Sequence, residues 1–339
     1  MTKAYIKAIQ YYLPEMVLDN ASINASHPEW SIEKIASKTG IYQRHIAAED
    51  EFSSDMAVKA AEKLFAEESI DRSSIDFIIL CTQSPDYFLP TTACMLQSRL
   101  KLSKNIGAFD FNLGCSGFVY GLGIAKGLIV TGQAKNVLLI TAETYSKFIH
   151  PSDKNNKTIF GDAAAATLIS AEKDAHGVNG EILAFTYSTD GEGAEYLIVK
   201  NGGMKQRDAT GFDVVSENGF VRNDDNLFMD GKAIFNFTAF NIPQLIKDDL
   251  QKNNVSTNDV DLFIFHQANE YMLQTLRKRC GIPADKFYIH LRDCGNTVSS
   301  TIPIALKHAI MENKIQPNHK ALLAGFGVGL SAAAVVIQY

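Results

Sequence analysis

The sequence lacks the features of a secreted, membrane-inserted or nucleic-acid-binding protein. Its 339 residues contain only five cysteines, an odd number with no CxxC spacing, which argues against a disulfide framework and against a structural zinc site. A net charge of −6 gives no general attraction to nucleic acid or to anionic lipid. The first residues contain no unbroken apolar stretch like that of a signal peptide. We therefore predict a cytoplasmic protein with no nucleic-acid partner and no membrane partner.

Motifs for phosphate, dinucleotide or metal binding are also missing. There is no GxxxxGK[ST] and no HExxH, and the glycine clusters at 114–123 and 325–329 lack the GxGxxG and distal acid of a dinucleotide site. The eight histidines are scattered, with no pair at i and i+4. We predict no metal and no bound cofactor.

An internal repeat is present instead. The segment DFIILCTQS at 76–84 resembles DLFIFHQAN at 261–269, since each has an acidic start, an apolar run and a polar end. In each half a helix-length segment, an apolar strand and an Ala-rich strand follow. They lie at 116–131, 136–142 and 163–170 in the first half, and at 299–313, 320–326 and 331–339 in the second. The same α/β unit therefore occurs twice.

This repeat predicts the fold class. Strands that alternate with helices and are apolar throughout indicate parallel sheets covered on both faces. We predict an α/β protein with duplicated α/β/α/β/α layering, made of an N-terminal half at 1–175 and a C-terminal half at 176–339. Reactive groups in such sheets gather at the carboxyl ends of the strands.

One candidate for chemistry lies between a strand and a helix of the first half. Cys115 follows the strand GAFDFN in the turn LGCSG, just before an apolar helix. A helix N-terminus or a nearby imidazole lowers the pKa of a thiol, so this position favours a thiolate nucleophile. The alternative is a small buried hydrophobic residue.

Two further candidates belong to the second half. His266 ends the strand DLFIFH, where the alternative is a core histidine, and Asn296 precedes the helix equivalent to the one after Cys115, where the alternative is a helix cap. The repeat predicts that Cys115 and Asn296 face each other. A protease-like site, in which the amide orients the imidazole, and a condensing site, in which both groups stabilise an enolate, are open at this point.

The motifs around these residues resemble a known family. GCSGF at Cys115, IFGDAAAA at Gly161, HQAN at His266 and GNTVSSTIP at Asn296 occur in the order found in β-ketoacyl-acyl carrier protein synthase III, of the thiolase superfamily. The resemblance implies the duplicated five-layered α-β-α-β-α fold. It also implies an acyltransferase of fatty acid biosynthesis that condenses an acyl-CoA starter with malonyl-acyl carrier protein, with loss of carbon dioxide. Acyl-CoA would be a substrate, and no cofactor would be needed.

Two other functions fit the same resemblance. One is a specialised condensing or acyl-transfer enzyme of polyketide, quinolone or resorcinol metabolism. The other is a non-catalytic subunit that binds acyl carrier protein, which the intact Cys115, His266 and Asn296 argue against.

The resemblance also assigns roles to single residues. Cys115 would accept the acyl group, His266 and Asn296 would stabilise the decarboxylated donor, and the backbone N–H groups of Cys115 and Val328 would form an oxyanion hole. Coenzyme A would be bound by Trp30, Lys34, Lys154 and Asn269.

Further roles implied by the resemblance concern protein contacts. Leu89, in the loop YFLP, would reach across a homodimer and floor the partner's acyl pocket, leaving room for a starter longer than acetyl. Arg277 and Arg279 would dock the acidic carrier protein. Their alternative role is to complement the dipole of a helix that ends before Gly281.

Overall fold

The computed structural model describes residues 2–28, 31–173, 179–215 and 221–339. The long strands of the first half are β1 (Tyr5–Tyr12), β4 (Phe77–Cys81), β5 (Gly107–Phe111), β6 (Asn136–Glu143) and β7 (Ala163–Ser170). Those of the second half are β8 (Gly180–Thr189), β13 (Leu262–Phe265), β14 (Phe287–Tyr288), β15 (Lys320–Gly327) and β16 (Ser331–Gln338).

The two halves have the same strand topology. The hydrogen-bonded order β14-β13-β15-β16-β8-β1-β7-β6-β4-β5 consists of two five-stranded sheets, each with order 3-2-4-5-1 when counted from its own first strand. A short antiparallel pairing of β1 with β8, Tyr5 opposite Glu181, joins them. The predicted boundary between residues 175 and 176 lies outside the described residues.

The sheets are mixed, so the prediction of parallel sheets is correct for three strands of each half and wrong for the others. Strands β4, β5 and β6 are parallel, as are β13, β14 and β15, but β7 and β16 run antiparallel to both of their neighbours. The chain reverses between β15 and β16 through the tight turn 328–330, which is a hairpin connection and needs no crossover helix.

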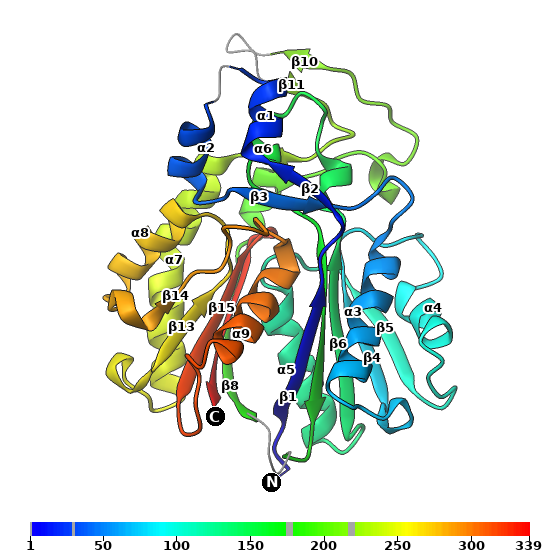
Figure 1. Cartoon of the computed structure of the whole chain (residues 1–339), viewed down its shortest axis with the longest axis vertical. Coiled ribbons are helices and arrows are strands. Elements are labelled where there is room, and N and C mark those ends of the chain that lie inside the picture. Colours follow the sequence, from blue (N-terminus) through cyan, green and yellow to red (C-terminus); the bar gives the residue numbers. More distant parts are fainter. Residues whose placement is uncertain (1, 29–30, 174–178, 216–220) are drawn as a thin grey trace.

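Helices cover both sheets in five layers (Figure 1). Apolar side chains of α3 (Ser53–Glu67) and α4 (Thr92–Arg99) pack on the outer face of the first sheet, and those of α7 (Gly231–Lys252) and α8 (Glu270–Arg279) pack on the outer face of the second. Between the sheets lie α5 (Gly117–Val130) and α9 (Thr301–Met311), which share one core with both. The predicted five-layered fold is confirmed.

Short elements gather above the carboxyl ends of the parallel strands, at the top of Figure 1. They are β2 (Met16–Asp19), α1 (Asn20–Ser26), α2 (Ile32–Thr39), β3 (Gln43–Ile46), α6 (Lys154–Lys157), β9 (Leu197–Ile198), β10 (Val214–Val215), β11 (Val221–Arg222) and β12 (Phe228–Met229). None of the described helices combines the length and the apolar character needed to cross a bilayer.

Candidate active site

Cys115 lies in a tightly packed turn between β5 and α5. Ser116 is the N-cap residue and α5 begins at Gly117, so the thiol sits just before the helix N-terminus. The backbone of β15 presses against this turn, because a Cβ atom on Gly327 would lie 2.8 Å from the Cys115 sulfur. Glycine at 327 therefore allows the second half of the chain to approach the thiol.

His266 follows the last residue of β13 and is almost fully buried, with 2% of its surface exposed. Its Nδ1 atom lies 2.8 Å from the Thr301 hydroxyl at the start of α9. Burial lowers the pKa of His266 from 6.5 to about 3, so the imidazole is neutral at physiological pH.

Asn296 lies in the loop that leads to the 3₁₀ turn Val298–Ser300 and α9. Its backbone N–H donates to the Ile159 carbonyl at 2.9 Å, and its side-chain oxygen accepts the Val298 N–H at 2.9 Å. Because the oxygen is held in this way, the NH₂ group of the amide is available as a donor.

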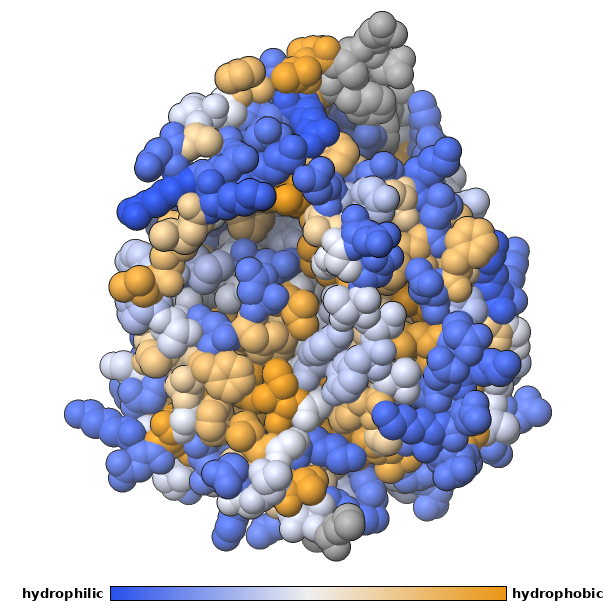
Figure 2. Space-filling model, turned by 180° about the vertical axis from the view of Figure 1, so that it is seen from behind, coloured by the Kyte–Doolittle hydropathy of each residue, from blue (hydrophilic) through white to orange (hydrophobic). Residues whose placement is uncertain are grey.

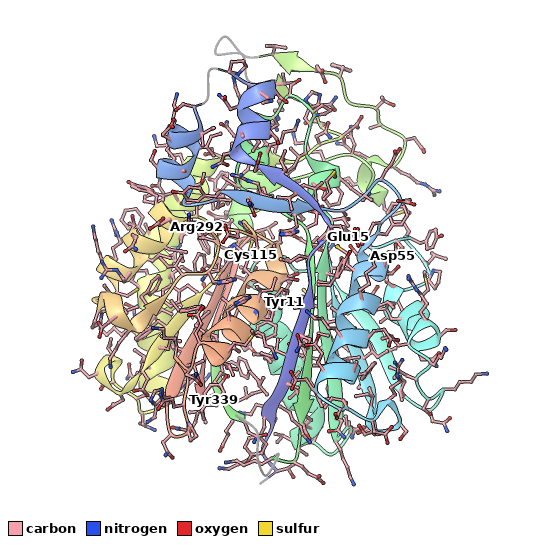
Figure 3. The ribbon with its side chains drawn as sticks, viewed as in Figure 1. Tyr11, Glu15, Asp55, Cys115, Arg292 and Tyr339 are labelled. Atoms are coloured by element: carbon pink, nitrogen blue, oxygen red, sulfur yellow. The ribbon has the colours of Figure 1, made fainter. Side chains whose placement is uncertain are left out.

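One cavity brings these three side chains together. Cys115, His266 and Asn296 line a space of about 130 Å³ whose other walls are mainly apolar, formed by residues such as Phe160, Ile234 and Phe326. Figure 3 shows Cys115 between the two halves, near the upper ends of the central strands. A thiol, a neutral imidazole and a carboxamide therefore face a small, largely apolar space.

A larger cavity of about 900 Å³ leads to the inner one. Both are lined by Ile159, Met229, Gly231, Asn269 and Met272. The outer cavity can hold an elongated ligand, and the inner cavity can hold its reacting end.

Burial opposes the thiolate that the position of Cys115 before a helix favours. Burial raises the pKa of the thiol to about 12, while hydrogen bonds from the backbone of Val328 and of Cys115 itself oppose that shift only in part. The position before α5 favours a thiolate, whereas the loss of water around the sulfur favours the neutral thiol. At rest the group is a thiol.

Val328 follows β15, and its backbone lies against the Cys115 sulfur. In this turn the positive φ of +137° belongs to Gly329, so a valine at 328 is compatible with the backbone. The two N–H groups predicted to form an oxyanion hole are thus directed at the same atom.

The residues predicted to bind coenzyme A lie at different places. Asn269 caps α8 and lines both cavities, whereas neither Lys34 nor Lys154 is among the residues that line the outer cavity. Trp30 lies outside the described residues. Sequence reasoning missed the cationic side chains that do line the outer cavity, which are Lys38, Arg222 and Lys232. No motif marks them, because they come from three separate elements.

The predicted contact residues are on the surface. Leu89 is 82% exposed, next to the exposed Tyr87 and Phe88. Arg279 is exposed and lies over the Phe240 ring. Arg277 donates a hydrogen bond to the Ile282 carbonyl at 3.0 Å and so ties the C-terminal end of α8 to the residues that follow it.

Sequence reasoning also missed a buried acid that is bonded to the loop beside the Cys115 turn. Glu143, the last residue of β6, is fully buried and accepts hydrogen bonds from the Gln83 N–H at 3.0 Å and from the Ser299 hydroxyl at 3.0 Å. Gln83 in turn accepts a hydrogen bond from Tyr145 at 2.6 Å. These contacts connect the loop below Cys115 to the start of α9.

Among the described residues, His290, His308 and Glu312 form the one cluster with metal-ligand atoms close together, within 4.8 Å. The two imidazoles are stacked face to face, with ring centroids 3.8 Å apart. Their lone pairs lie in nearly parallel ring planes and do not converge on one ion. None of the three residues lines the cavity that Cys115, His266 and Asn296 share.

Comparison with known proteins agrees with this geometry. The sequence model of 3-oxoacyl-[acyl-carrier-protein] synthase III matches residues 109–191, and that of its C-terminal part matches residues 250–339. A β-ketoacyl-[acyl-carrier-protein] synthase III from Clostridioides difficile is 36% identical over 341 residues, covering 100% of this chain and 99% of the relative. The chain belongs to the 3-oxoacyl-[acyl-carrier-protein] synthase III family.

Solved structures of synthase III proteins have the same fold. One crystal structure of a 3-oxoacyl-(acyl-carrier-protein) synthase III is 44% identical with a TM-score of 0.96, covering 99% of this chain and 100% of that chain. The Thermus thermophilus synthase III is 32% identical with a TM-score of 0.86, covering 98% of each chain. A priming β-ketosynthase of the R1128 polyketide pathway is 25% identical with a TM-score of 0.85, covering 99% of this chain and 96% of that chain.

Proposed function

We propose that the protein catalyses the decarboxylative Claisen condensation of an acyl-CoA starter with malonyl-acyl carrier protein, through an acyl-Cys115 intermediate. The observation that carries this proposal is the convergence of Cys115, His266 and Asn296 on one cavity. The curated relatives named β-ketoacyl-[acyl-carrier-protein] synthase III support a role in fatty acid biosynthesis. They favour that role over the specialised condensing enzymes.

In the first half-reaction, the Cys115 sulfur attacks the thioester carbonyl of acyl-CoA. The carbonyl oxygen gains negative charge, which the N–H groups of Cys115 and Val328 stabilise. The carbon–sulfur bond to coenzyme A breaks, and the proton of the Cys115 thiol passes to the departing sulfur. Because the resting group is a thiol, the proton leaves during the attack.

In the second half-reaction, the malonyl thioester loses carbon dioxide and the electron pair of that bond forms an enolate. Hydrogen bonds from the neutral His266 and from the Asn296 NH₂ group stabilise the enolate oxygen. The carbanion attacks the acyl-Cys115 carbonyl, and the Cys115 thiolate leaves and takes a proton from solvent. A neutral imidazole suits this step, because an imidazolium would protonate the enolate.

The outer cavity supports a route for coenzyme A. Lys38, Arg222 and Lys232 place positive charge around it, where phosphates would gain favourable contacts, and Asn269 lies where the two cavities meet. Lys34 and Lys154 would act from positions beside the cavity. Acyl-CoA enters as a substrate, and the reaction described here needs no further cofactor.

A homodimer is part of the proposal. Tyr87, Phe88 and Leu89 form an exposed apolar loop, and β5 is an edge strand of its sheet. The rear face in Figure 2 is hollowed in its upper half, with hydrophilic residues along the upper border of the hollow and apolar residues mainly below it. Exposed apolar surface of this kind is typical of protein contacts.

The cytoplasm is the proposed compartment, because all five cysteines are free thiols and the reaction requires one of them reduced. In this proposal Arg279 docks the acyl carrier protein, and Arg277 stabilises the C-terminal end of α8.

Intact-protein mass spectrometry with a series of acyl-CoA thioesters tests the proposal. We expect the wild type to gain one acyl group and Cys115→Ala to gain none. Cys294→Ala is the matched control, since Cys294 is also buried and lies two residues from Asn296. Acyl label on Cys294 in the Cys115→Ala protein would overturn the assignment.

The two half-reactions are then measured separately. His266→Ala and Asn296→Ala are expected to keep self-acylation but to lose malonyl decarboxylation by about 10²–10³-fold each, as for removal of one oxyanion donor. If both variants lost only acylation, a protease-like role for His266 would replace the one proposed.

A further inference from the structure

One turn orients both donors of the proposed enolate site. The Val298 N–H holds the side-chain oxygen of Asn296, and the Val298 carbonyl accepts the Thr301 hydroxyl at 3.0 Å. The same hydroxyl lies 2.8 Å from His266 Nδ1. Val298 has a φ of +55°, which is rare for a β-branched residue and typically costs about 1–3 kcal/mol. In this conformation the Val298 N–H is directed at Asn296 and the Val298 carbonyl at Thr301, whose hydroxyl contacts His266.

The Thr301 hydroxyl has one proton and two acceptors within reach. If it donates to the Val298 carbonyl, Nδ1 of the neutral imidazole must carry the proton and Nε2 has only a lone pair. If it donates to Nδ1, the imidazole proton resides on Nε2. Only the second arrangement offers an N–H to a thioester oxygen in the cavity.

The surroundings permit the second arrangement. The Val298 carbonyl already accepts the backbone N–H of Thr301, so turning the hydroxyl toward Nδ1 leaves no buried acceptor without a partner. Within the part of the chain that the structure describes, no protein group is hydrogen-bonded to Nε2, and His266 lines the catalytic cavity.

We propose that Thr301 is a positioning residue whose hydroxyl donates to His266 Nδ1 and thereby keeps the imidazole proton on Nε2, where it can stabilise the enolate. This inference rests on the proposed function and adds a residue that does not itself touch the substrate. It predicts that loss of the hydroxyl moves the proton to Nδ1, because the Val298 carbonyl, whose hydrogen bond with His266 raises the pKa of the imidazole, then remains as an acceptor for it.

The test compares three variants with the wild type. Thr301→Val removes the hydroxyl at almost constant volume, and Thr301→Ser restores it. Thr167→Val is the matched control, since Thr167 in β7 is fully buried and its hydroxyl has no hydrogen-bond partner. Nitrogen-15 NMR of histidine-labelled protein locates the proton on His266, whose signals are assigned by their loss in His266→Ala.

We expect the wild type and Thr301→Ser to carry the proton on Nε2 and Thr301→Val to carry it on Nδ1. Malonyl decarboxylation is expected to fall about 10²–10³-fold in Thr301→Val, with self-acylation retained, and to be unchanged in Thr167→Val. Retained self-acylation also shows that Thr301→Val has folded.

A proton on Nδ1 in the wild type would overturn the inference, even if Thr301→Val failed to fold. Normal decarboxylation by Thr301→Val would overturn it as well. Failure of the proposed function is distinguishable, because the wild type would then neither acquire acyl groups nor decarboxylate malonyl-carrier protein, whatever the position of the His266 proton.

Discussion

Replacing the buried Glu143 by glutamine is expected to change how stability depends on pH. Burial raises the pKa of Glu143 from 4.5 to about 8, and its hydrogen bonds to Gln83, Ser84 and Ser299 offset only part of that effect. The folded protein therefore keeps this carboxyl group protonated at neutral pH, whereas the unfolded chain ionises it. The contribution of Glu143 to the free energy of unfolding is therefore fully present below about pH 4.5 and is lost as the pH rises toward 8.

The size of the effect follows from the two pKa values. One pKa unit corresponds to about 1.4 kcal/mol, so moving the pKa from 4.5 to about 8 lowers the free energy of unfolding by up to about 5 kcal/mol above pH 8. At pH 5 the same group lowers it by only about 1 kcal/mol. Glutamine imitates the protonated acid: its oxygen can accept the Gln83 N–H and its NH₂ group can donate to Ser299.

Urea unfolding at pH 5, 6, 7 and 8 measures this difference at one protein concentration. The wild type is expected to lose a few kcal/mol more than Glu143→Gln between pH 5 and pH 8, and the variant to be the more stable protein at pH 8. Other titrating groups cancel in the comparison because both proteins contain them. Parallel stability curves for the two proteins would refute a protonated Glu143.

Two further predictions concern specificity and docking. Leu89→Phe is expected to shift the starter preference toward shorter acyl groups by about 1–3 kcal/mol for each excluded methylene, measured as kcat/KM over an acyl-CoA series; an unchanged profile would show that Leu89 does not floor the partner's pocket. Lys278→Glu with Arg279→Glu is expected to raise KM for malonyl-carrier protein in a salt-dependent way while self-acylation is retained, and Arg277 is left intact because it closes α8. Equal losses in both half-reactions would contradict a docking role.

Sequence reasoning predicted the positions of the central elements well, because apolar strands and helices leave a periodic signal. The strands predicted at 136–142 and 320–326 are β6 and β15, and the helix predicted at 116–131 is α5. Strand direction was predicted less well. An antiparallel strand and a parallel strand that are buried on both faces read alike, and only the length of the connection separates them.

For the site, too, the positions of the residues could be predicted from the sequence but their protonation could not. The repeat led to Cys115, His266 and Asn296, which one cavity brings together, because strand ends and helix starts can be read from the sequence. The pKa of Cys115 could not be read in this way. It depends on how completely β15 covers the thiol, which is a property of packing between segments far apart in the chain.

The duplicated fold explains why the site residues Cys115, His266 and Asn296 could be predicted from the sequence, whereas the roles of Gly327 and Glu143 could not. β6 and β15 are the fourth strands of the two halves: β15 ends against the turn that carries Cys115, and β6 ends against the loop 82–84 and the start of α9. In the second half that end is Gly327, whose missing side chain lets the backbone approach Cys115, and in the first half it is Glu143, whose carboxyl group supports the loop beneath it. A repeat predicts that the two positions are equivalent in space, but it does not predict that they have different roles. Because the Gly327 backbone lies against the Cys115 sulfur, substitution of Gly327 is expected to disturb acylation directly, whereas Glu143 acts through its hydrogen bonds to Gln83 and Ser299.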